Sequence, residues 1–237
     1  MEHNETKLYP IEKFSKKAII IQENSYIDKS TLVIPKNYTP YVDRVVLTKG
    51  MIMDRIDKIA QEITKDFFDK NLVLLIVMKG AVVFGSTLVE KINDILSNDI
   101  TNSYSMSFSV EYVDIKSYVD DKSTGDVKIR IDEKVAERLR GQNVIVVEDI
   151  YDSGKSLYEL DKFLLSFSPA SLKSTVLIQK MNVENLKYDY KVDYLGFLVP
   201  NTFIIGFGMD YNEKFRHLYH LCVINSEGIK QFKSNNC

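Results

Sequence analysis

The residues with the clearest chemical potential lie in one short stretch, "VIVVEDIYDSGKSL", residues 144–157. Three acids fall within five positions: Glu148, Asp149 and Asp152. They are followed by Ser-Gly-Lys-Ser at 153–156, where the glycine can adopt the positive φ of a tight turn. The backbone amides of such a turn, at the start of a helix, attract anions. Carboxylates beside this turn are therefore useful only if the acids and the turn serve different targets.

The turn is not the P-loop of nucleotide-binding proteins, G-x-x-x-x-G-K-[ST]. Gly154, Lys155 and Ser156 match its end, but Asp149 stands where its first glycine belongs, and a carboxylate there would repel a polyphosphate. We therefore expect Ser153 to Ser156 to hold a single phosphate. Two adjacent acids suit a vicinal diol, as in dinucleotide sites, and Asp152 is left to act as a base. Phosphate plus diol indicates a ribose 5-phosphate. The alternative is that this stretch is only a capped helix start.

The elements that position these groups alternate between buried strands and amphipathic helices. Continuous apolar runs predict strands at 71–80, 144–147 and 173–180, with shorter strands in "YLGFLVP", "TFIIGFG" and "LCVI". Apolar residues spaced three and four apart predict helices from Gly50 to Phe67, over roughly 82–96, and after the Ser-Gly turn. Residues 101–128 predict a strand, a long loop and a second strand. This alternation is typical of an α/β fold with a central, mostly parallel sheet flanked by helices. Ligands of such sheets bind beyond the carboxyl ends of the strands, where "MKG", "EDIYDSGKS" and "QKMN" all fall.

Composition excludes several classes of protein. The chain has 237 residues, 45% of them hydrophobic, and a net charge of -2, which does not indicate binding to nucleic acid or to an anionic membrane surface. No apolar run approaches the roughly 20 residues of a membrane helix, and the first 20 residues lack the apolar core of a signal peptide. With only two cysteines there is no disulfide framework, so we expect a cytoplasmic protein.

The stretch resembles the phosphoribosyl-pyrophosphate motif of type I phosphoribosyltransferases, within them the hypoxanthine-guanine branch. "LLIVMKG", "KSYVDDKSTGDVKI" and "VDYLGFLVPNTFIIGFGMDYNEKFRHLYHLCVINSEG" are similar to further motifs of that branch, in the same order. The resemblance implies the type I phosphoribosyltransferase fold with a small hood sub-domain. We expect an N-terminal extension at 1–30 and a phosphoribosyltransferase domain at 31–237. Its core would span about 50–200, with the hood from about 31–49 and 200–235.

The resemblance also implies roles by position. The chain would carry the phosphoribosyl group of phosphoribosyl pyrophosphate to a 6-oxopurine, with Mg²⁺ as cofactor and a homo-oligomer, dimer or tetramer, as its assembly. The implied residues are Glu148 and Asp149 at the ribose hydroxyls and the metal; Asp152 as general base; Ser153, Gly154, Lys155 and Ser156 at the 5'-phosphate; Lys79, Gly80 and Arg216 at pyrophosphate; Lys180, Phe203 and Ile204 at the purine; Asp210 at Mg²⁺ beside the purine; and Lys116, Ser117 and Tyr118 in a mobile loop.

The chain departs from the family pattern at three places. Asp114 stands where arginine is usual, Val82 follows the Lys-Gly loop where a polar residue is common, and Met181-Asn182 follow Lys180 in place of arginine and threonine. These losses of basic residues favour a second hypothesis, a non-catalytic relative that binds the same ligand as a sensor. The retained Asp152 favours an enzyme. His217 and His220 are spaced like a metal pair on a helix, but no third ligand has suitable spacing.

Overall fold

A computed structural model describes residues 18–99, 106–117, 127–188 and 190–233 of the chain. Its main sheet has seven strands in the order β1-β8-β7-β6-β3-β4-β5, and among the described strands every pairing is parallel except that of β4 with β5. The bounds are β1 Ile19–Ile20, β3 Asn71–Met78, β4 Ser107–Ser117, β5 Val127–Arg130, β6 Asn143–Tyr151, β7 Ser171–Lys180 and β8 Tyr194–Val199. The predicted central, mostly parallel sheet is thus confirmed.

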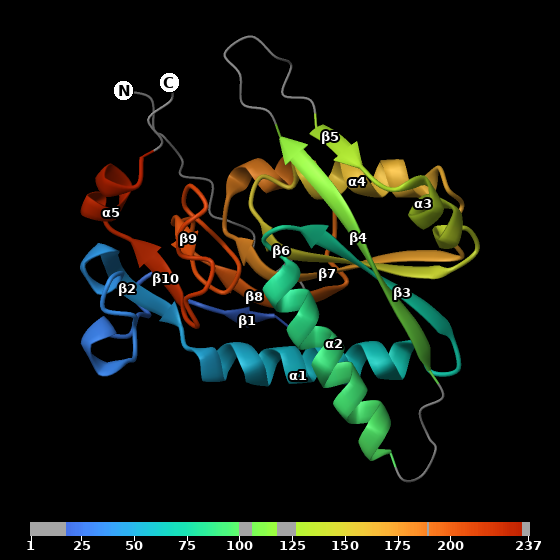
Figure 1. The fold of residues 1–237 in the computed structure, drawn as a ribbon, viewed down its shortest axis with the longest axis horizontal. Helices are drawn as coiled ribbons and strands as arrows, with labels where there is room; N and C mark the ends of the chain where they lie inside the picture. Colours follow the sequence, from blue (N-terminus) through green and yellow to red (C-terminus); the bar gives the residue numbers. More distant parts are fainter. Residues whose placement is uncertain (1–17, 100–105, 118–126, 189, 234–237) are drawn as a thin grey trace, which may run out of the picture.

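Helices cover both faces of this sheet (Figure 1). α1 (Lys49–Asp66) and α2 (Val82–Asn98) pack against each other on one face, and α3 (Glu133–Leu139) and α4 (Lys155–Leu165) lie on the other. The apolar spacing that predicted α1 holds, because Ile56, Ile59 and Ile63 are fully buried. β3 and β6 contribute continuous apolar runs because both of their faces are covered.

A second sheet of three antiparallel strands lies at one end of the molecule, in the order β2-β10-β9 (Figure 1). Its strands are β2 Val42–Leu47, β9 Ile204–Ile205 and β10 Leu221–Ile224, and α5 (Ser226–Gln231) follows β10. Segments from both ends of the chain therefore combine here around a separate small core that includes Val45, Phe215 and Cys222. The domain boundaries given above stay a prediction.

Two details differ from the sequence-based expectations. The strand expected at 144–147 continues to Tyr151, so Glu148 and Asp149 lie within β6 instead of beyond its end. The reason is that parallel pairing continues past the apolar run, up to the match of Tyr151 with Gln179. In addition, part of the expected N-terminal extension is structured, because Ile19 and Ile20 pair with β8 at the edge of the main sheet.

Candidate active site

The order of the strands places the candidate site at the centre of the main sheet. From β3 the chain goes outward to β4 on one side, and from β6 it goes outward to β7 and β8 on the other. The carboxyl ends of β3 and β6 thus meet at the point where the strand order reverses, which is where open α/β sheets bind ligands. A cavity of about 570 Å³ lies there, a size typical of small-molecule sites. The predicted site residues that line it are Lys79, Gly80, Glu148, Asp149, Asp152, Ser153, Gly154, Ser156, Asp210 and Arg216.

The two adjacent acids of β6 contact each other, and the pKa values of both are raised. Asp149 is only 7% exposed, and its backbone N–H donates to Oε1 of Glu148 at 3.1 Å. Burial raises the pKa of Glu148 well above its usual range, and the neighbouring Asp149 carboxyl raises it further. Burial also raises the pKa of Asp149, while Glu148 and the Arg216 charge oppose that rise. Hydroxyl donors or a cation in the cavity would stabilise the charged form of this pair.

The turn after β6 is built as the sequence predicted. Gly154 has φ +85° and caps the start of α4. A Cβ at this position would lie 2.4 Å from the Tyr151 hydroxyl oxygen, so a larger residue would have to displace a buried ring. Ser153 and Ser156 reach the cavity lining, and Lys155 does not line it. The turn therefore presents small hydroxyl residues and the start of an eleven-residue helix to the cavity.

Asp152 lies between two donors from the next strand and its extension. Lys180, the last residue of β7, donates from Nζ to Asp152 Oδ2 at 2.8 Å. Asn182 donates from Nδ2 to Asp152 Oδ1 at 2.7 Å. The Lys180 side chain is 9% exposed and that of Asp152 is 45% exposed. The carboxylate of Asp152 thus lines the cavity, while its cationic partner Lys180 is almost completely buried.

The loop after β3 rests directly on the acid pair. The peptide bond between Met78 and Lys79 is cis. A Cβ on Gly80 would lie 2.1 Å from Oδ2 of Asp149, so only glycine fits beside that carboxylate. The main chain of this loop, and not its side chains alone, therefore shapes the cavity next to Asp149.

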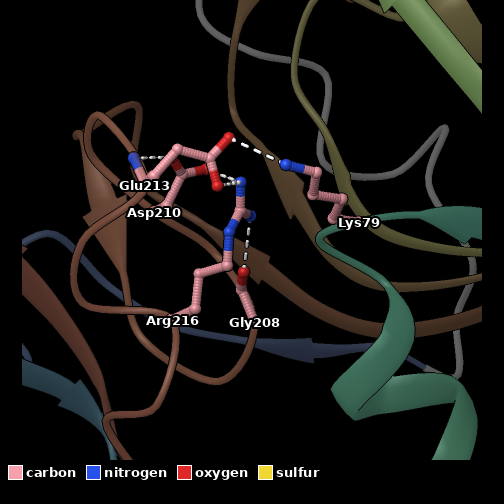
Figure 2. Close-up of polar contacts among 5 residues, drawn as sticks. All are labelled: Lys79, Gly208, Asp210, Glu213 and Arg216. Carbon is pink, nitrogen blue, oxygen red and sulfur yellow. Dashed lines mark hydrogen bonds and ion pairs between the residues drawn. The ribbon is translucent and has the colours of Figure 1, made fainter.

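Charged residues of the segment between β9 and β10 complete the rim of the cavity (Figure 2). Arg216 pairs with Asp210 at 2.8 Å and with Glu213 at 3.3 Å, and its NH1 donates to the Gly208 carbonyl at 2.9 Å. Glu213 also pairs with Lys79 at 3.3 Å. Its hydrogen bonds with Lys79 and then with Arg216 lower the pKa of Glu213. Arg216 Nε is buried and has no hydrogen-bond partner within the described part of the chain.

Of the residues expected at the purine, Phe203 lies near Lys180. The Phe203 ring is 49% exposed, meets Tyr211 edge to face at 5.5 Å, and lies 5.9 Å from Lys180 Nζ. Ile204 is buried in β9. A flat ring stacked on Phe203 would therefore lie within reach of the Lys180 ammonium.

Three predicted residues belong to the segment expected to be mobile. Lys116 and Ser117 end β4, where their backbones pair with Lys128 and Val127 of β5. Tyr118 lies outside the described residues. The antiparallel β4–β5 pair flanks residues 118–126, which also lie outside the described residues.

Some site residues were missed from the sequence. Glu213 could have been found, because it stands three residues before Arg216 in a highly charged segment. The contact of Asn182 with Asp152 had no local signal, since 30 positions separate them. The two histidines are not a helical pair: His217 packs against the Tyr38 ring, and His220 Nδ1 accepts a hydrogen bond from the Lys49 backbone N–H at 2.9 Å. Within the described residues no group of three or more His, Cys, Asp or Glu side chains could hold a metal.

Comparisons with known proteins agree with this geometry. The model of the phosphoribosyl transferase domain matches residues 46–212. The human hypoxanthine-guanine phosphoribosyltransferase is 33% identical over 216 residues, which cover 91% of this chain and 96% of that protein. The chain belongs to the hypoxanthine-guanine phosphoribosyltransferase family. The rat member is likewise 33% identical, over 93% of this chain and 98% of its own length.

Solved structures of this family have the same fold. The crystal structure of hypoxanthine-guanine phosphoribosyltransferase from Schistosoma mansoni in complex with IMP has a TM-score of 0.74 at 29% identity, covering 91% of this chain and 98% of that one. Trypanosoma cruzi hypoxanthine phosphoribosyl transferase has a TM-score of 0.70 at 28% identity, covering 83% and 98%. The fold is thus the type I phosphoribosyltransferase fold of this family. No helix among the described residues could span a membrane.

Proposed function

We propose that this chain transfers the 5-phosphoribosyl group from phosphoribosyl pyrophosphate to N9 of a 6-oxopurine and releases pyrophosphate. Hypoxanthine and guanine are the expected bases, xanthine a further candidate, and IMP, GMP or XMP the product, as in purine salvage. One observation carries the proposal. At the switch point of the sheet, one cavity is lined by an acid pair, an anion-holding turn and the carboxylate of Asp152, which is tied to a lysine.

The sugar and its phosphate would be held by β6 and α4. Ser153 to Ser156 would bind the 5'-phosphate through backbone amides and hydroxyls at the positive end of α4. Glu148 and Asp149 would accept hydrogen bonds from the ribose hydroxyls. Those hydroxyls would supply donors to a pair whose pKa values are raised by burial. This division explains why carboxylates lie beside an anion-binding turn.

The purine would lie between Phe203 and the Asp152–Lys180 pair. Lys180 would donate to the 6-oxo group, which adenine lacks; its amino group would place a donor against a donor. As the N9–C1' bond forms and the C1'–oxygen bond to pyrophosphate breaks, the proton on N7 would pass to Asp152. Displacement at C1' develops positive charge on the ribose and is damaged by water, so closure of the loop that contains Tyr118 would protect it.

Pyrophosphate would lie between the Lys79–Gly80 loop and Arg216, which line the cavity together. Mg²⁺ would be held by one or two of the carboxylates of Asp210, Glu148 and Asp149, which line the cavity. The lack of a three-ligand cluster in the described residues suits an ion that binds through one or two carboxylates plus substrate phosphates. When bound, Mg²⁺ would neutralise charge on the leaving pyrophosphate. We also propose a cytoplasmic homo-oligomer.

The test is incubation of the purified chain with phosphoribosyl pyrophosphate, Mg²⁺ and, separately, hypoxanthine, guanine, xanthine or adenine, with nucleotide and pyrophosphate both quantified. We expect nucleotide from hypoxanthine and guanine, and none from adenine. Equal rates with adenine would contradict the role of Lys180. Binding of phosphoribosyl pyrophosphate without product from any base would favour the second candidate function, a non-catalytic sensor. The acidic Asp114 in the cavity lining is the observation that supports this candidate.

A further inference from the structure

Asn182 is held at both ends of its side-chain amide. Its Nδ2 donates to Asp152 Oδ1 at 2.7 Å, and its Oδ1 accepts from the Glu184 backbone N–H at 3.0 Å. The second bond lies at the start of a short 3₁₀ helix, Val183–Lys187. Because a backbone N–H can only donate, the carbonyl end of the amide must face Glu184. The donor end is thereby directed at Asp152.

The two donors on Asp152 differ in what else they can reach. Lys180 Nζ, on Oδ2, also lies 5.9 Å from the centre of the exposed Phe203 ring. A 6-oxopurine stacked on Phe203 would offer this ammonium a second acceptor, and Lys180 could move to it. The Asn182 amide is held by the backbone N–H of Glu184 at the start of the 3₁₀ helix, and its donor end contacts Asp152. Lys180 could therefore leave Asp152 for the purine oxygen during the reaction, whereas the Asn182 amide would stay bonded to Asp152.

We propose that Asn182 is a positioning residue for the reaction: it holds Oδ1 of Asp152 while Oδ2 takes the proton. Lys180 leaves Oδ2 for the purine oxygen, and Oδ2 then accepts the N7 proton, whose bonding pair stays on the purine as N9 bonds to C1'. Without Asn182 the carboxylate of Asp152, which is 45% exposed, could rotate when Lys180 leaves. This inference rests on the proposed function. It also gives a purpose to one of the positions at which the sequence departs from the family pattern.

Asn182→Ser separates this role from a local structural one. A serine hydroxyl can still accept from the Glu184 backbone N–H but is too short to reach Asp152. We expect kcat to fall about tenfold, the worth of one hydrogen bond to a charged group. KM for both substrates should stay within about twofold, because neither substrate contacts Asn182 in this scheme. In an Asp152→Asn background the same substitution should cause no further loss of kcat, because Asn182 acts on the reaction only through the Asp152 carboxylate.

Asn225→Ser is the matched control. Asn225 is also held at both ends: Nδ2 donates to the Pro40 carbonyl at 2.7 Å, and Oδ1 accepts from the Gly228 backbone N–H at 2.8 Å. It lies at the start of α5, in the small sheet region. We expect its kcat to stay within about twofold of wild type, so that a general penalty for losing such an amide is excluded.

The outcomes separate the inference from the proposed function. A wild type that forms no nucleotide would end the proposed function, and this inference with it. An active wild type whose Asn182→Ser variant keeps its kcat would overturn the inference alone. So would an equal loss in the wild-type and Asp152→Asn backgrounds, or a raised KM with unchanged kcat, because each indicates a structural or binding role instead.

Discussion

Two charged clusters line the same cavity, but one lies on the central sheet and the other on loops. Glu148, Asp149 and Asp152 lie on or just after a central strand, and the partner of Asp152, Lys180, is 9% exposed. The second cluster, Lys79 with Glu213, joins two loops, and both of these side chains are 64% exposed (Figure 2). The first cluster is built on the sheet, whereas the second lies on loops and is joined by an exposed ion pair.

This difference indicates that the two clusters have different tasks in binding, a contrast called the division of labour below. Exposed ion pairs contribute only about 0–1 kcal/mol, so Lys79 and Arg216 can exchange Glu213 for a bound polyanion at little cost. The backbone that carries Glu148 and Asp149 belongs to a strand paired on both sides within the seven-stranded sheet. Under the proposed function, the groups that would align the sugar and the base lie on or beside the central sheet, and the groups that would contact the leaving pyrophosphate lie on the rim of the cavity.

The largest effect is expected from the rigid cluster, at Asp152. Asp152→Asn keeps the side-chain shape but removes the base, so we expect kcat to fall about 100-fold or more, the usual contribution of general-base catalysis. KM for phosphoribosyl pyrophosphate should change little. Initial rates with hypoxanthine measure this, and unchanged turnover would rule out Asp152 as the base.

A smaller but clear effect is expected where the two clusters meet, at Gly80. Gly80→Ala would place a Cβ 2.1 Å from Asp149 Oδ2, so the carboxylate or the loop must shift. We expect KM for phosphoribosyl pyrophosphate to rise about tenfold, equivalent to about 1.4 kcal/mol of lost binding. Gly50→Ala is the matched control, because the nearest atom to its new Cβ would be Thr48 Oγ1 at 3.8 Å. An equal KM in the two variants would contradict the close packing of the loop on Asp149.

The smallest effect is expected on the rim, at Glu213. Glu213→Gln removes the charge that competes with pyrophosphate for Lys79 and Arg216, so KM for phosphoribosyl pyrophosphate should fall by about two- to threefold at low salt. The gain should shrink at high ionic strength, where exposed charges are screened. Glu159→Gln on α4 breaks another exposed pair, with Lys162 at 3.7 Å, and should leave KM unchanged. A raised KM in Glu213→Gln would show that Glu213 helps to bind the anion site instead of competing for it.

The same contrast separates what the sequence predicts from what it does not. The strands β3 and β7, the helix α1 and the turn at Gly154 were predicted correctly, because each leaves a local trace: an apolar run, a spacing of three and four, or a glycine before a helix. Many of the residues that the family resemblance implied line one cavity at the carboxyl ends of the strands. Their roles stay predictions.

Features that depend on pairing between distant segments were missed. β1 has only two residues, too few to show an alternation of apolar and polar residues, and it forms because it pairs with β8. The extension of β6 through the acid pair depends on its ladder with β7. The contact of Asn182 with Asp152 depends on the register between the ends of two neighbouring strands. None of these leaves a signal in the neighbouring residues.

The most direct test of the division of labour measures whether the acid pair recognises the sugar hydroxyls. Calorimetric titration would compare IMP with its 2',3'-dideoxy analogue on wild type and on the double variant Glu148→Gln/Asp149→Asn. We expect wild type to prefer IMP by about 30-fold, as hydrogen bonds to charged acceptors contribute about 2 kcal/mol. The double variant should discriminate less than about threefold, and Ser156→Ala, at the phosphate turn, should weaken both nucleotides equally. Undiminished discrimination in the double variant would contradict the assignment of these acids to the sugar.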